Sequence, residues 1–225
     1  TMANLALFDL DMTMLNVDSD HSWGQFIVER GLVDAGVYAD ANDKFYQDYI
    51  NGTLDAVEYN EFVADFLKTQ SMDELQAYRQ EYLDTWIIPN MRPKAVEQIN
   101  YHKNQGDTVV VISATNDFVV KPIANLFGVD DAHTMATALE IRENRYTGKV
   151  VGRPNFKEGK LYHLGEFIKR CQDDDIVFDK TIAYSDSKND LPLLDFADEA
   201  VCVTPDGILR REAEARGWRI EDWSF

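Results

Sequence analysis

Short apolar runs alternate with longer amphipathic segments along most of this chain. The runs Leu5–Phe8, Val109–Ile112, Thr181–Tyr184 and Ala200–Val203 are each four residues long. Between them lie segments in which apolar residues recur at helical spacing. Because strands buried on both faces have apolar residues in succession, this alternation is typical of a parallel sheet covered by helices. The pattern predicts an α/β fold with a doubly wound, Rossmann-like parallel sheet.

The region after Pro89 shows the alternation most regularly, interrupted by one hairpin that turns at Glu143-Asn144. Gly106 and Gly128 end two of its helices. The predicted helices are Arg92–Gln105, Phe118–Phe127, Glu158–Cys171, Asp190–Phe196 and Asp206–Ala215. The predicted strands are Asp107–Ser113, the hairpin arms Met135–Ile141 and Arg145–Val151, Thr181–Ser185 and Ala200–Val203.

A helical segment of about seventy residues follows the first strand. A capping box at Ser71 and Glu74 sets the start of its last helix. Its aromatic residues recur at helical spacing and are interpreted as its own core, although some could also face a neighbouring site. The predicted helices run from Ser19 or Asp20 to Gly31 and over Ala35–Ile50, Leu54–Leu67 and Met72–Trp86. We therefore predict a core domain from residues 1–15 and 89–225 and an inserted all-helical cap domain from residues 16–88.

Composition and charge narrow the function classes. The 225 residues carry a formal net charge of −18, which argues against a nucleic acid or an anionic membrane surface as partner. The two cysteines are too few for a disulfide framework. No apolar run approaches the roughly 18 residues that a membrane helix needs. We expect a cytoplasmic protein with a small-molecule partner; the sequence leaves its oligomeric state open.

Acidic residues stand at the ends of two predicted strands. Asp9 and Asp11 follow the first strand and point to the same side of it. Asp186 and Asp190 follow the Thr181–Ser185 strand. One such pair could simply lie at a solvated strand end, where an aspartate forms an Asx turn. Two pairs at strand ends, where ligands of parallel sheets collect, instead predict an oxygen-ligand site for Mg²⁺ and a metal-dependent enzyme.

Four separated motifs carry a resemblance to a known family. They are Asp9-x-Asp11-x-Thr13, Ser113 at a strand end, Lys160 at the start of a helix, and Asp186-x-x-x-Asp190. In this order they make the chain resemble a haloacid dehalogenase-superfamily phosphatase of the phosphoserine phosphatase-like branch. The resemblance extends over nearly the whole chain and implies hydrolysis of a small phosphomonoester.

The resemblance implies a role for each motif residue. Asp9 would attack phosphorus to form an aspartyl-phosphate, and Asp11 would act as general acid and then general base. Lys160 would stabilise the transferring phosphoryl group, with Lys157 as a competitor for this role. The Asp9 carboxylate, the Asp11 backbone carbonyl and the Asp186 carboxylate would bind Mg²⁺. Asp190 would support the metal indirectly or ligate it.

Phosphate oxygens would be held by hydrogen-bond donors at the strand ends. The Ser113 hydroxyl and the amides of Ala114 and Thr115 are one such group, although a lone serine there is also typical of a helix cap. Asn189 and Thr13 complete the phosphate-binding set that the resemblance implies.

The predicted cap indicates a substrate class. Asp18 stands where phosphoserine phosphatases keep an acid for the substrate ammonium, although Asp18 or Asp20 could also cap the next helix. These phosphatases use a cap arginine for the substrate carboxylate, and no arginine occurs between Gly31 and Tyr78. An amine-bearing ester without a carboxylate, such as histidinol phosphate, therefore fits at least as well as phosphoserine.

Two other functions are compatible with the same motifs. A phosphotransferase would pass the aspartyl-phosphate to an alcohol instead of water. A non-catalytic, phosphate-responsive binding protein would need only part of the site. The presence of both Asp9 and Asp11 argues against the second function, because binding alone does not require the second acid.

Overall fold

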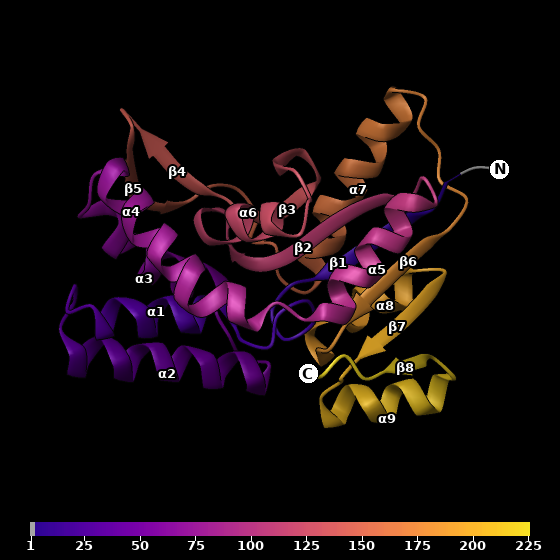
Figure 1. The fold of residues 1–225 in the computed structure, drawn as a ribbon, viewed down its shortest axis with the longest axis horizontal. Helices are drawn as coiled ribbons and strands as arrows, with labels where there is room; N and C mark the ends of the chain where they lie inside the picture. Colours follow the sequence, from indigo (N-terminus) through magenta and orange to yellow (C-terminus); the bar gives the residue numbers. More distant parts are fainter. Residues whose placement is uncertain (1–2) are drawn as a thin grey trace.

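The computed structural model describes residues 3–225 and contains one six-stranded parallel sheet (Figure 1). Residues 1 and 2, which begin the predicted first core segment, lie outside the described residues. The strand order is β3-β2-β1-β6-β7-β8, and every neighbouring pair is parallel. The strands are β1 (Leu5–Asp9), β2 (Thr108–Asn116), β3 (Thr134–Thr137), β6 (Thr181–Ser185), β7 (Glu199–Val203) and β8 (Arg219–Glu221). The predicted doubly wound, Rossmann-like sheet is thus confirmed.

Successive side chains of the central strand enter two different hydrophobic cores. Ala6 and Phe8 belong to one core and Leu5 and Leu7 to the other, because successive side chains of a strand point to opposite faces of the sheet. Helices α5 and α6 pack in the first core, and α7, α8 and α9 pack in the second. These helices are α5 (Pro93–Asn104), α6 (Asp117–Leu126), α7 (Glu158–Asp173), α8 (Leu191–Phe196) and α9 (Gly207–Arg216).

The segment after β1 is helical, as predicted. It contains α1 (Ser19–Glu29), α2 (Ala35–Asn51), α3 (Ala56–Lys68) and α4 (Met72–Tyr82), followed by a π-helical turn, Leu83–Ile87, and a 3₁₀ turn, Ile88–Asn90. The capping box at Ser71 and Glu74 forms in both directions. The Trp23 ring meets the edge of the Phe118 ring, which ties α1 to α6. Figure 1 shows α1 and α2 side by side, away from the β6–β8 edge of the sheet.

The predicted hairpin is correct at its turn but wrong in its first arm. Glu143 and Asn144 have φ angles of 51° and 62°, as a two-residue hairpin turn requires, between β4 (Leu139–Arg142) and β5 (Arg145–Val150). The first arm was predicted as Met135–Ile141, but its beginning is β3, which pairs with β2 in the main sheet. The hairpin packs against α3, where the Glu61 carboxylate accepts a hydrogen bond from the Val150 amide.

Two further differences concern the strands. β2 was predicted to end at Ser113, but it continues through a register shift to Asn116, which caps α6. β8, which pairs with β7, is too short and too polar to stand out in the sequence. Among residues 3–225, no helix has both the length and the apolar character needed to cross a membrane.

Candidate active site

The nucleophile predicted at the end of β1 lies in a buried ion-paired cluster. Lys160, on the first turn of α7, places its Nζ 3.1 Å from Asp9 Oδ1 and 2.8 Å from Asp190 Oδ1. Burial raises the pKa of Asp9 to about 6 against the opposing charge of Lys160. Burial alone would lower the pKa of Lys160, but the charges of Asp190 and Asp9 outweigh it and raise this pKa. One lysine thus compensates two carboxylates.

Lys157, the alternative lysine, does not contact these acids. Its Nζ donates a hydrogen bond of 2.8 Å to the backbone oxygen of Gly52, at the C-terminal end of α2. Asn189 makes a similar connection, from its Nδ2 to the Tyr49 oxygen at 3.1 Å. These two bonds join the strand-end loops to the helical segment.

Thr13 lies between two acids from different strand ends. Its Oγ1 is 2.9 Å from Asp186 Oδ1 and 3.2 Å from Asp9 Oδ2, and it accepts a hydrogen bond from the Asp186 amide. Burial raises the pKa of Asp186 well above its ordinary range, and the charge of Asp9 raises it further. The Ser185 hydroxyl donates to Asp190 Oδ2 at 2.7 Å. The fold therefore brings together the two predicted acid pairs.

This donor set suits a hard divalent cation. Asp9 and Asp186 contact the same hydroxyl, and a cation beside them would offset the burial and the charges of neighbouring carboxylates that raise their pKa values. The described part of the chain has no group of three or more His, Cys, Asp and Glu side chains placed to hold a metal ion. Two carboxylates and a backbone carbonyl, completed by water and substrate, are nevertheless compatible with Mg²⁺, which usually keeps several waters.

Asp11 is held by groups from β2 and α1. Its Oδ1 accepts from the Ser19 amide at 2.6 Å, and its Oδ2 accepts from the hydroxyls of Thr115 at 2.9 Å and Ser113 at 3.3 Å. Ser113 is fully buried, and its hydroxyl also accepts from the Thr115 amide. In this structure the predicted phosphate ligand Ser113 therefore orients Asp11.

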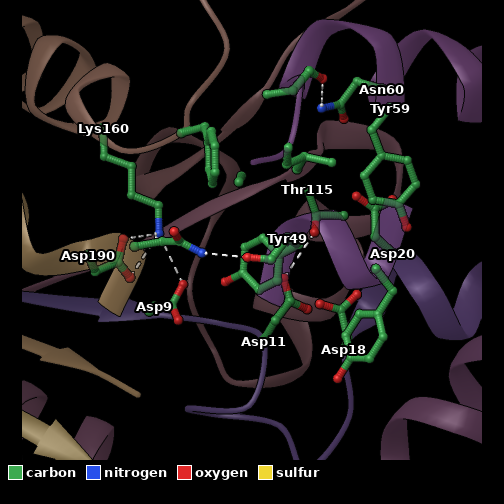
Figure 2. Close-up of a pocket in the computed structure, with 16 residues that line it drawn as sticks. Asp9, Asp11, Asp18, Asp20, Tyr49, Tyr59, Asn60, Thr115, Lys160 and Asp190 are labelled. Atoms are coloured by element: carbon green, nitrogen blue, oxygen red, sulfur yellow. Dashed lines mark hydrogen bonds and ion pairs between the residues drawn. The ribbon is translucent and has the colours of Figure 1, made fainter. Parts of the chain in front are cut away.

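A cavity lies between the strand ends and the helical segment (Figure 2). Its volume is about 20 Å³, and an outer cavity of about 310 Å³ shares Asp18, Tyr46, Tyr49 and Asn189 with it. The inner cavity is lined by Asp9, Asp11, Asp18, Asp20, Tyr46, Tyr49, Leu54, Ala56, Tyr59, Asn60, Ala114, Thr115, Phe156, Lys160, Asn189 and Asp190. Most of the predicted site residues thus share one cavity.

Two acids of α1 and its cap contribute charge to this cavity. Asp18 caps α1 by accepting from the His21 amide at 2.8 Å, so it has the alternative capping role and also faces the cavity. Burial, followed by the charge of Asp11, raises the pKa of Asp18 well above its ordinary range. Burial, followed by the charge of Asp18, does the same to Asp20. Unlike Asp9 and Asp190, neither contacts a lysine or arginine among the described residues.

Sequence reasoning missed several residues that shape the site. Asp20 and Asn60 line the cavity but belong to no motif. Tyr49 and Tyr59, interpreted mainly as helical core, also line it. Arg92 is 2% exposed and donates to the backbone oxygens of Leu15 and Met12, so it holds the loop that follows β1. Its only sequence signal is a cation at the start of a helix, which is common.

Comparison with known proteins agrees with the fold. Residues 6–195 match the model of the haloacid dehalogenase-like hydrolases, and the chain belongs to this family. A histidinol-phosphatase of Neisseria meningitidis serogroup C (strain 8013) is 41% identical over 220 residues, which cover 97% of this chain and 98% of that protein. The chain is accordingly a phosphatase.

Two solved structures are also similar. A protein with unknown function from Bordetella pertussis Tohama I superposes with a TM-score of 0.91 at 37% identity, with 100% of both chains covered. A substrate-bound phosphoserine phosphatase complex superposes with a TM-score of 0.70 at 20% identity, covering 100% of this chain and 94% of that chain. At that identity the second likeness concerns the fold alone.

Proposed function

We propose that this phosphatase hydrolyses histidinol phosphate, a phosphomonoester that bears an ammonium group and no carboxylate. The main support is the charge of the cavity: Asp9, Asp11, Asp18 and Asp20 line it, and Lys160 is its one lining cation among the described residues. Because Lys160 already pairs with Asp9 and Asp190, a substrate carboxylate inside this inner cavity would be repelled. The similarity to a protein named histidinol-phosphatase supports the same substrate.

In the first step of the proposed mechanism, an Asp9 carboxylate oxygen attacks phosphorus and the bond to the substrate oxygen breaks. Asp11 gives its proton to that oxygen, so the alcohol leaves neutral. Lys160 stabilises the charge on the transferring phosphoryl group, and Ala114 and Asn189, which line the cavity, bind its oxygens. Ser113 orients Asp11, and Thr13 holds Asp9 and Asp186. The product of this step is the aspartyl-phosphate.

In the second step, Asp11 takes a proton from a water molecule, the water oxygen attacks phosphorus, and the bond to Asp9 breaks. Asp9, Asp186 and the Asp11 carbonyl would hold Mg²⁺, with support from Asp190, and the bound ion would supply positive charge to neutralise the phosphate. The division into a core, residues 1–15 and 89–225, and a cap, residues 16–88, belongs to the same proposal. The cap would open to admit substrate, because the inner cavity of about 20 Å³ is too small for it.

Substrate comparison tests this proposal. We expect Mg²⁺-dependent release of phosphate from histidinol phosphate with a kcat/KM at least about tenfold above that for phosphoserine, because an unpaired carboxylate loses affinity. EDTA and Asp9→Asn should each remove the activity. A clear preference for phosphoserine would contradict the cavity argument, and turnover that survives Asp9→Asn would contradict the mechanism. Transfer to added alcohols instead of water would identify a phosphotransferase.

A further inference from the structure

Two buried acceptor atoms on residues that line the cavity have no hydrogen-bond partner in residues 3–225. They are Oδ1 of Asp20 and Oδ1 of Asn60, in side chains of residues that are 5% and 2% exposed. An unpartnered buried polar atom destabilises the fold, so such atoms are rare unless a ligand completes them. Both residues line the inner cavity, although they come from different helices, α1 and α3.

The orientation of Asn60 leaves its acceptor available. Its Nδ2 donates to the Ala56 oxygen, one turn earlier in α3, at 2.7 Å. This bond fixes which end of the amide is the donor and directs the carbonyl oxygen away from the helix backbone. The Tyr59 hydroxyl does not donate a hydrogen bond to Asp20, because it donates to Asn42 Oδ1 at 3.5 Å. Asp20 and Asn60 therefore each keep one acceptor oxygen that no group of the described residues satisfies.

These acceptors lie at the end of the cavity away from the phosphate chemistry. Figure 2 shows Asp9, Lys160 and Asp190 on one side and Asp20, Tyr59 and Asn60 on the other. Tyr49, Tyr59 and Phe156, with Leu54 and Ala56, supply flat or small apolar walls. A planar ring can pack against such walls, and its polar edge then needs hydrogen-bond acceptors.

We infer that Asp20 and Asn60 are specificity-determining residues that accept hydrogen bonds from the ring N–H groups of an imidazole-type substrate. This inference rests on the proposed function and deepens it, because it assigns the ring to a second subsite distinct from the Asp18 position for the ammonium. A protonated imidazole offers two N–H donors and a positive charge, which complement one amide oxygen and one carboxylate. A phenyl ring has the same shape but leaves both acceptors unpaired.

Three substrates separate the ring N–H from the rest of the molecule. Phosphoethanolamine has the ammonium and phosphate without a ring, and phenylalaninol phosphate has a ring without N–H groups. Wild-type enzyme should prefer histidinol phosphate to phenylalaninol phosphate in kcat/KM by at least about 10²-fold, since a site built for a polar group rejects an analogue that lacks it. Asp20→Asn should reduce this ratio by about 10- to 100-fold, mainly through KM, because a charge-assisted bond is lost.

Asn60→Leu should reduce the same ratio by about tenfold, as expected for a neutral hydrogen bond. Asp40→Asn, an exposed substitution of equal charge on α2, should leave the ratio unchanged. Thermal unfolding of each variant verifies that it is folded. If wild-type enzyme hydrolyses histidinol phosphate, but Asp20→Asn and Asn60→Leu show the wild-type ratio of kcat/KM for histidinol phosphate to that for phenylalaninol phosphate, the inference of a ring subsite is wrong. The proposed function then stands. If wild-type enzyme does not hydrolyse histidinol phosphate but hydrolyses other phosphomonoesters, the substrate proposal fails, and the subsite with it.

Discussion

The two ends of the cavity differ in how their acids are compensated. At the strand ends, Asp9 and Asp190 share Lys160, and Asp186 is bound to Thr13. At the far end, Asp18 and Asp20 have no cation partner in the described part of the chain, and Asp20 Oδ1 accepts no hydrogen bond from it. Both ends are acidic and buried, but only the first is internally satisfied.

This difference separates chemistry from recognition. A network in which a lysine and several hydroxyl groups hold the acids fixes its geometry before substrate arrives, as phosphoryl transfer requires. Unpaired acceptors in an apolar setting cost stability until a donor arrives, so they discriminate strongly between ligands. On the proposed function, the strand ends of the sheet carry the chemistry, and the helical segment carries the recognition.

The largest effect is expected from removing the lysine that compensates the acids at the strand ends. Lys160→Met removes the one cation of two buried carboxylates, whose residues are each 3% exposed. We expect the free energy of unfolding to fall by about 3–5 kcal/mol, since a buried ion pair has lost one partner. The kcat should fall by about 10³-fold because transition-state charge is no longer stabilised. Urea unfolding and steady-state kinetics measure the two losses; wild-type values in either would argue against the compensation of Asp9 and Asp190 by Lys160.

A smaller effect of opposite sign is expected at the unsatisfied end. The pKa of Asp20 is raised in the folded protein above its ordinary 3.8, so this carboxyl favours folding below pH 3.8 and disfavours it once the pH exceeds the folded pKa. Asp20→Asn, in substrate-free protein, should therefore raise the free energy of unfolding at pH 8 by about 1–2 kcal/mol. The gain should disappear as the pH approaches 4.

Unfolding curves of Asp20→Asn and the exposed control Asp40→Asn across pH 4–8 give this comparison. The control should change stability by less than about 0.5 kcal/mol at every pH. A loss of stability in Asp20→Asn at pH 8 would mean that Asp20 is satisfied in the free protein, and the contrast between the two ends would disappear.

The smallest effect is expected where the two regions meet. Lys157→Met removes one hydrogen bond to the Gly52 oxygen, worth about 1 kcal/mol, and leaves the Asn189 bond to Tyr49 intact. We expect kcat/KM to change by less than about tenfold and kcat to change little. Steady-state kinetics of Lys157→Met and Lys160→Met, measured together, compare a matched pair of variants, since the two lysines are separated by only one turn of chain. An equal loss of kcat in both variants would contradict this expectation, because it would mean that Lys157 also stabilises the phosphoryl group.

The sheet and the acid pairs were predictable because their signals are local. The strands β1 and β6 each contain a short apolar run, and Asp9 and Asp186 lie at their ends, so the rule that parallel strands end at one edge was enough to bring these acids together. The start of the α4 helix was predictable for the same reason, from Ser71 and Glu74. The β3 strand was not, because Met135 and Ile141 belong to one apolar run that the fold divides between two sheets.

The sequence by itself therefore determined the α/β class, the helical insertion and the identity of the acids at the strand ends. Only the tertiary structure decided that Lys160, not Lys157, lies beside Asp9, because the two differ by the turn at the start of α7. It also decided that Asp20 and Asn60 line one cavity. Forty residues separate them, and their proximity depends on how α1 and α3 pack over the sheet, which no local pattern encodes.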